Sequence, residues 1–208
     1  MRRPVLVALL ALVVTGAGVT AGTLLLDSDE RPSGPSAFAT TPLATFDTST
    51  LTVPRASFCD AVDPRQVEAA LGGEPADTAS YENGDEVALA DGVTDVAHEF
   101  GCAWTGAEGD QARAWVFAPP VDRGRAKRLV RDAERTEGCD ASPTPPYGAP
   151  SVGLTCADSD GVRASYQGLF GDAWLTCELS APDPGTDRAA LVERAGAWCV
   201  GVALGASG

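Results

Sequence analysis

Six cysteines are the residues of this sequence with the most specific chemistry, and their number is even. No two follow a C-x-x-C spacing and the intervals fit no zinc finger, so a metal site or a redox centre is disfavoured. An even number of cysteines is typical of structural disulfides in an oxidising compartment. The six are Cys59, Cys102, Cys139, Cys156, Cys177 and Cys199.

Six cysteines allow about fifteen pairings, and periodicity favours one of them. Cys102, Cys156 and Cys177 alternate in phase with apolar residues of predicted strands, which directs all three toward the core. The other three lie beside or inside predicted helices. The simplest arrangement clips each helix to the sheet, with the pairs 59–102, 139–156 and 177–199.

Catalytic and metal-binding motifs are weak. His98 is the only histidine, and no G-x-S-x-G motif is present. Because His98 alternates in register with Phe100, we predict that it lies at the end of a strand and is not a catalytic base. The segment 158–161, Asp-Ser-Asp-Gly, resembles the start of a calcium loop, but Leu169 stands where that loop needs Glu. We interpret it as a hairpin turn. The acidic residues single out no carboxylate pair of the glycosidase type, so we predict no catalytic residue, metal site or cofactor.

Four tryptophans supply the best candidate for a binding surface. Trp104 and Trp198 fall on predicted core faces, whereas Trp115 and Trp174 fall on the opposite faces of their strands. Exposed aromatic side chains that share one sheet face are a common feature of binding sites. The competing interpretation is that the linker or loops cover Trp115 and Trp174.

The N-terminal segment, 1–26, has the features of a membrane-targeting sequence. Arg2 and Arg3 precede an uncharged, apolar run that is long enough to span a bilayer, and acidic residues follow it. The domain is therefore expected outside the membrane. Two interpretations stay open: cleavage near Ala21 with secretion, or retention as a single-pass anchor through the leucines at 24–26. A lipoprotein is disfavoured because no cysteine ends the apolar run.

The remaining chain divides by composition into a linker, 27–57, rich in Ser, Thr, Pro and Asp, and a domain, 58–208. The net charge of −14 disfavours nucleic acid as a partner, because phosphate backbones would repel this surface. A basic predicted helix, about 122–137, is the exception. Its cations either pair with the acidic segment 74–99, predicted to be an exposed loop, or dock an acidic partner.

Hydrophobic periodicity and turn residues predict an α+β domain with the element order αββαβββα. One antiparallel sheet of about five strands is expected, with helices packed on one face. The first helix follows Asp63 and ends at Gly72-Gly73. An edge strand at 45–53 is a further option. The last helix is capped by Thr186 or Asp187 and runs to about Leu204. The predicted strands are 98–104, 112–118, 151–157, 162–170 and 173–180.

Three short patterns lie near the two early cysteines: Phe58-Cys59-Asp60, a helix that ends at Leu71-Gly72, and Gly101-Cys102-Ala103-Trp104. Together they resemble a family of actinobacterial exported lipoproteins of unknown function. The lipid-bearing cysteine of that family is missing here, so lipidation does not carry over. The resemblance implies no catalytic residues.

These observations predict a non-enzymatic protein of the cell envelope. We expect it to bind a ligand or partner on the outer face of the membrane, such as another envelope protein or a glycan. A secreted hydrolase of envelope polymers is an alternative, which predicts two close carboxylates in a cleft. A structural or assembly component is another, which predicts a flat apolar patch and no pocket.

Overall fold

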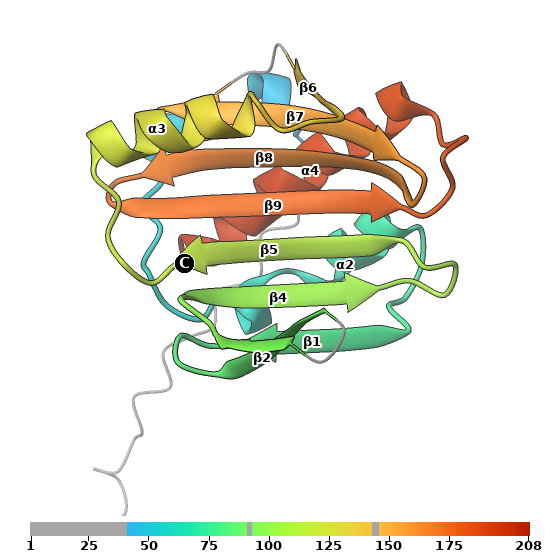
Figure 1. The fold of residues 1–208 in the computed structure, drawn as a ribbon, viewed down its shortest axis with the longest axis horizontal. Coiled ribbons are helices and arrows are strands. Elements are labelled where there is room, and N and C mark those ends of the chain that lie inside the picture. The colour runs from blue at the N-terminus through green and yellow to red at the C-terminus, as the bar shows by residue number, and fades with distance from the viewer. Residues whose placement is uncertain (1–40, 91–92, 143–145) are drawn as a thin grey trace, which may run out of the picture. The chain divides into compact units, whose positions relative to one another are not determined.

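The protein is represented by a computed structural model that describes residues 41–90, 93–142 and 146–208. Every described residue belongs to one compact unit, Ser36–Gly208. The predicted membrane segment, 1–26, and the first part of the predicted linker lie outside the described residues. The described part of this unit is an α+β domain built on an antiparallel sheet (Figure 1).

Seven strands form this sheet, and every neighbouring pair is antiparallel. Two further strands form a separate hairpin. The spatial order in the sheet is β1 (Asp77–Tyr81), β4 (Glu99–Thr105), β5 (Gln111–Phe117), β9 (Ala173–Ala181), β8 (Gly161–Phe170), β7 (Ser151–Asp158) and β6 (Cys139–Ser142); the hairpin is β2 (Glu86–Ala90) with β3 (Val93–Val96).

One face of the sheet, the core face, packs against the helices α2 (Pro64–Leu71) and α4 (Arg188–Ala206), which lie behind the sheet in Figure 1. Strand alternation places the small residues Ala112 and Ala114 on this face, fully buried, beside fully buried apolar residues of α4. Both helices begin at an aspartate whose carboxylate accepts backbone N–H groups of the first turn: Asp63 for α2, as predicted, and Asp187 for α4, one of the two predicted caps.

The opposite face, the outer face, is covered only in part. Helix α3 (Arg123–Ala133) lies in front of β7 and β8 in Figure 1. Ala126 is its buried residue, and Leu129, Val130 and Ala133 pack with it against the strands. The prediction of helices on one face only is therefore wrong, because the apolar stripe of α3 is buried on the outer face.

Three disulfides join all six cysteines in the expected pairs, Cys59–Cys102, Cys139–Cys156 and Cys177–Cys199. Two details differ. Cys139 lies in β6, so its bridge joins two strands and does not clip a helix to the sheet as predicted. Cys156 belongs to the apolar cluster of β7 on the outer face, against Val130 and Ala133 of α3. Alternation along β7 predicts which residues share a face but not which of two buried faces that is.

The acidic segment 74–99, predicted to be a loop, contains β1, β2 and β3. Four of the five β1 residues are exposed, so β1 lacks the apolar alternation that marks a half-buried strand. It is held as an edge strand by its pairing with β4. β6 is a second short edge strand, in which Cys139 lies opposite Cys156. The sheet therefore has two strands more than predicted.

The basic helix α3 does not pair with this acidic segment. No ion pair among the described residues joins the two, and the one recorded on the α3 side is local, between Arg135 and Asp132. The reason is topological, because β1 lies at one edge of the sheet and α3 packs near the other.

Residues 41–57, predicted to be linker, pack onto the core. Leu43 and Val53 are buried, and Phe46 and Leu51 lie against the same cluster. This stretch forms the 3₁₀ turns η1 (Leu43–Thr45) and η2 (Thr48–Thr50), where an edge strand at 45–53 was an option. The Thr48 hydroxyl donates to the carbonyl of Pro146 and accepts from the backbone N–H of Gly148, which ties the segment to the domain.

Within the described residues, one helix is long and apolar enough to cross a membrane, namely α4. Its residues Leu191, Ala195, Trp198 and Cys199 are buried against the sheet. The core position of α4 accounts for its apolar composition.

Candidate functional site

The two tryptophans expected on a shared surface have different environments. Trp115 of β5 is partly exposed on the outer face. Trp174 of β9 is on the same face but only 1% exposed, because α3 and the segment before it cover it with Val121 and Ala126. The proposed Trp115–Trp174 binding surface is thus reduced to Trp115. The cover consists of helix α3 and the loop residue Val121 before it, so the competing interpretation of cover by a loop is confirmed in part for Trp174.

Outside α3, the outer face carries polar side chains, which we call the open face. It consists of Gln111, Arg113 and Trp115 of β5, Glu178 and Ser180 of β9, and Arg163 and Gln167 of β8. All are exposed or partly exposed. No helix lies in front of β5 and β9 in Figure 1.

Arg113 and Glu178 lie directly opposite each other on β5 and β9. Opposite charges at such a position usually attract, and a cross-strand pair contributes up to about 1 kcal/mol. Among the described residues, however, no ion pair includes either side chain. The Arg113 guanidinium instead lies over the Trp115 ring, 5.6 Å from its centroid, in a cation–π contact.

The carboxyl group of Glu178 has no hydrogen-bond donor among the described residues. Burial raises the pKa of Glu178, while the positive charges of Arg113 and Arg163 act in the opposite direction. Glu178 is thus a partly buried acid between two guanidinium groups, with no direct partner.

A pocket of about 310 Å³ lies at the end of the open face, where the β7–β8 turn approaches the start of β5 and the end of β9. Its charged lining comprises Arg113, Arg163, Glu178, Asp158 and Asp160, and Gln111 and Ser180 are polar neighbours. Arg163 and Asp158 form a loose ion pair, with 3.9 Å between Nη1 and Oδ2. Both signs of charge therefore line one small cavity.

Gly161 shapes this pocket at the β7–β8 turn. Its φ of +130° disfavours any other residue, and a Cβ atom there would lie 2.1 Å from the Ala181 carbonyl oxygen. The turn forms as the sequence predicts, with the Asp158 carboxylate accepting the N–H of Asp160 at 2.9 Å. The glycine allows the turn to press against the end of β9.

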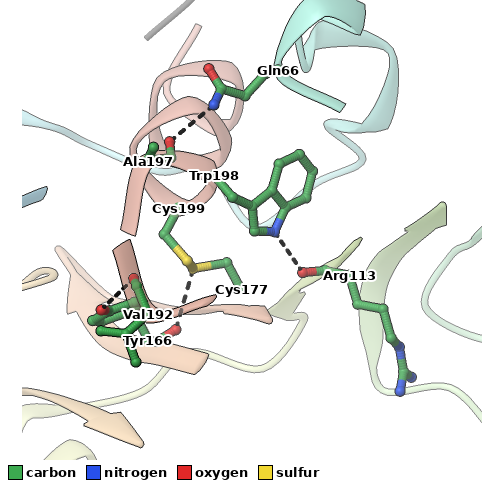
Figure 2. Close-up of a disulfide and its surroundings, with 8 residues drawn as sticks. All are labelled: Gln66, Arg113, Tyr166, Cys177, Val192, Ala197, Trp198 and Cys199. Carbon is green, nitrogen blue, oxygen red and sulfur yellow. Dashed lines mark hydrogen bonds between the residues drawn. A yellow bond between two sulfur atoms is a disulfide. The ribbon is translucent and has the colours of Figure 1, made fainter. Parts of the chain in front are cut away.

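The core face holds the two site strands in place, as Figure 2 illustrates. The indole N–H of Trp198 donates to the backbone carbonyl of Arg113 at 3.3 Å, while the Arg113 side chain points away from it. The Cys177–Cys199 disulfide fixes β9 at the residue before Glu178. Helix α4 therefore positions both Arg113 and Glu178 from the opposite side of the sheet.

The outer face continues onto β4 and β1 with a second aromatic side chain. Tyr81 lies over Gly101, where a Cβ atom would come within 2.2 Å of its ring, and Trp115 is the β5 partner of Gly101. The Tyr81 hydroxyl donates to Glu99 at 2.6 Å. Burial, then this hydrogen bond, raises the pKa of Tyr81, so the phenol stays neutral.

Sequence reasoning did not identify Arg113, Arg163 or Glu178. The only available signal was one charged residue among the non-core positions of each of three predicted strands, which is also what an ordinary solvated face looks like. His98 is exposed just before β4, and its carbonyl accepts the N–H of Ala118. Within the described residues, no group of three His, Cys, Asp or Glu side chains could hold a metal ion.

Comparison with known protein families, curated proteins and solved structures finds no match for this chain. The resemblance to actinobacterial exported lipoproteins therefore stays a prediction.

Proposed function

We propose that this chain is a non-enzymatic protein of the cell envelope that binds a small polar ligand at the open face of its sheet. The unpaired Arg113 and Glu178, opposite in register and beside a pocket, carry the proposal. Charged groups that make no internal ion pair contribute little to the fold, and they suit a ligand that supplies the missing partners.

The setting outside the membrane is part of the same proposal. Three disulfides in one domain favour an oxidising compartment. The arginines and apolar run of segment 1–26 favour export with the domain on the outer side. Tethered there, the domain would meet solutes and fragments of the envelope polymers.

The test is ligand-observed NMR with the purified full chain and a panel of amino acids, dipeptides, monosaccharides, disaccharides and dicarboxylates. We expect at least one class to bind and Arg113→Ala to abolish that binding. Arg131→Ala on the exposed side of α3 is the matched control and should bind normally. The proposal is wrong if no class binds, or if Arg113→Ala binds like the unaltered chain.

A hydrolase is the second candidate, because the pocket gathers the carboxylates of Asp158, Asp160 and Glu178. Two carboxyl groups that flank one cleft, one of them with a raised pKa as Glu178 has, are the arrangement that glycosidases use for general acid catalysis. This candidate requires turnover of an envelope glycan that is lost in Glu178→Gln. Binding without turnover in the same assay would support the non-enzymatic function.

A structural component of the envelope has less support. Among the described residues, the large apolar side chains that are exposed to solvent are Val93 and Val96 of β3. Two valines on a hairpin are far smaller than the apolar patches that mark stable protein interfaces.

A further inference from the structure

The pocket at the end of the open face offers free groups of both charge signs. Arg113 has no carboxylate partner and Glu178 has no cationic partner among the described residues, and they face each other across one strand pair. A ligand with a single sign of charge would satisfy one of them and be repelled by the other. A ligand that carries both signs satisfies both.

The rest of the lining disfavours other ligand classes. A neutral sugar is usually bound against an aromatic ring, but the Trp115 ring is outside the pocket lining and Arg113 lies over it. A polyanion would meet Asp158, Asp160 and Glu178, and a polycation would meet Arg113 and Arg163. The cavity of about 310 Å³ is at the lower end of the range for small-molecule sites.

We propose that this pocket binds a small zwitterion, a free α-amino acid, with the ligand carboxylate at Arg113 and the ligand ammonium at Glu178. This inference rests on the proposed function and names its ligand class. Arg113 offers the planar pair of N–H donors that matches a carboxylate, and the Glu178 carboxylate accepts from an ammonium group. Arg163 and Asp158 border the same pocket and are already paired with each other.

The proposal is tested by isothermal titration calorimetry of the full chain with glycine, alanine, leucine, glutamate and lysine. The tightest of these is then compared with its N-acetyl form, which lacks the ammonium, and its amide, which lacks the carboxylate. We expect the free amino acid to bind and each capped form to lose at least tenfold in affinity.

Two variants test which protein residue binds the carboxylate and which binds the ammonium group of the ligand. Arg113→Gln should lower the affinity for the free amino acid at least tenfold and remove the difference in affinity between the free amino acid and its amide. Glu178→Gln should remove the difference in affinity between the free amino acid and its N-acetyl form. Lys127→Gln, exposed on α3 and outside the pocket, is the control and should bind like the unaltered chain.

The outcomes separate this inference from the proposed function. If sugars bind and amino acids do not, or if both capped forms bind as well as the free amino acid, the proposal of a zwitterionic ligand is wrong and the proposed binding function is retained. Equal binding of a dicarboxylate would also overturn it. If nothing in either panel binds, both proposals fail.

Discussion

The indole N–H of Trp198 in helix α4 donates a hydrogen bond to the backbone carbonyl of Arg113 in strand β5, at 3.3 Å. The contact comes from the core face, whereas the Arg113 side chain extends toward the opposite face (Figure 2). A buried tryptophan thereby fixes the backbone from which an exposed binding residue projects. The candidate site depends on the core beneath it as much as on its own side chains.

Trp198→Phe tests this dependence. The ring keeps its edge-to-face contact with Trp104, but the Arg113 carbonyl loses the indole donor. We expect the free energy of unfolding to fall by about 1–3 kcal/mol, the usual effect of losing a buried hydrogen bond together with some packing. Ligand affinity should fall as well if Arg113 is a binding residue. Urea denaturation and titration calorimetry measure the two effects, and an unchanged stability would contradict the role given to the hydrogen bond.

Trp174 and Trp115 make a matched pair, since both lie on the outer face and only one is covered. Trp174→Ala removes a ring buried beneath α3 and should lower the free energy of unfolding by about 3–5 kcal/mol. Trp115→Ala removes a partly exposed ring and its contact with Arg113, and should lower it by about 1 kcal/mol. Denaturation curves of the two variants decide the point. Equal losses would mean that α3 does not cover Trp174 in solution.

Glu178→Gln should stabilise the protein at neutral pH. Burial raises the pKa of Glu178 in the folded state above its unfolded value, and Arg113 of β5 and Arg163 of β8 face it and limit the rise. The folded state therefore binds this proton more tightly, so stability falls as the pH rises from the unfolded to the folded pKa. We expect the variant to gain about 1 kcal/mol above this window and nothing below about pH 4.

Urea denaturation between pH 3.5 and 8 measures this difference. Glu193→Gln, on an exposed position of α4, is the control and should show no such pH-dependent gain. A variant less stable than the unaltered chain at pH 7 would mean that Glu178 has an ionic partner in solution.

The three disulfides differ in burial, so their removal should differ in effect. Each double alanine variant loses about 2–4 kcal/mol of stability from the released chain. Cys177 and Cys199 are both fully buried, so their removal also leaves a cavity in the core. We expect this pair to be the most damaging and the edge pair Cys139–Cys156 to be the least. Thermal melts of the three double variants give the order of stability. A different order would mean that burial of the cysteines does not decide how much each disulfide stabilises the fold.

The sequence predicted the helices α2, α3 and α4 well because capping aspartates and glycines are local signals. It also predicted β4, β5, β7, β8 and β9, whose core-facing residues alternate with others. It missed β1 and β6, which are edge strands with little apolar alternation. Their pairing is made by backbone groups of a neighbouring strand, which leave no periodic pattern in their own residues.

The sequence by itself determined that Cys59, Cys102, Cys139, Cys156, Cys177 and Cys199 form three bridges in an α+β domain, because cysteine number and strand phase constrain the pairing. Only the tertiary structure decided which side of the sheet each helix covers. Periodicity defines an apolar side but not what it packs against, so Trp174 and Trp115 look equivalent in the sequence. For the same reason the sequence did not reveal the candidate site: Arg113 and Glu178 are 65 residues apart and become neighbours only when β5 pairs with β9.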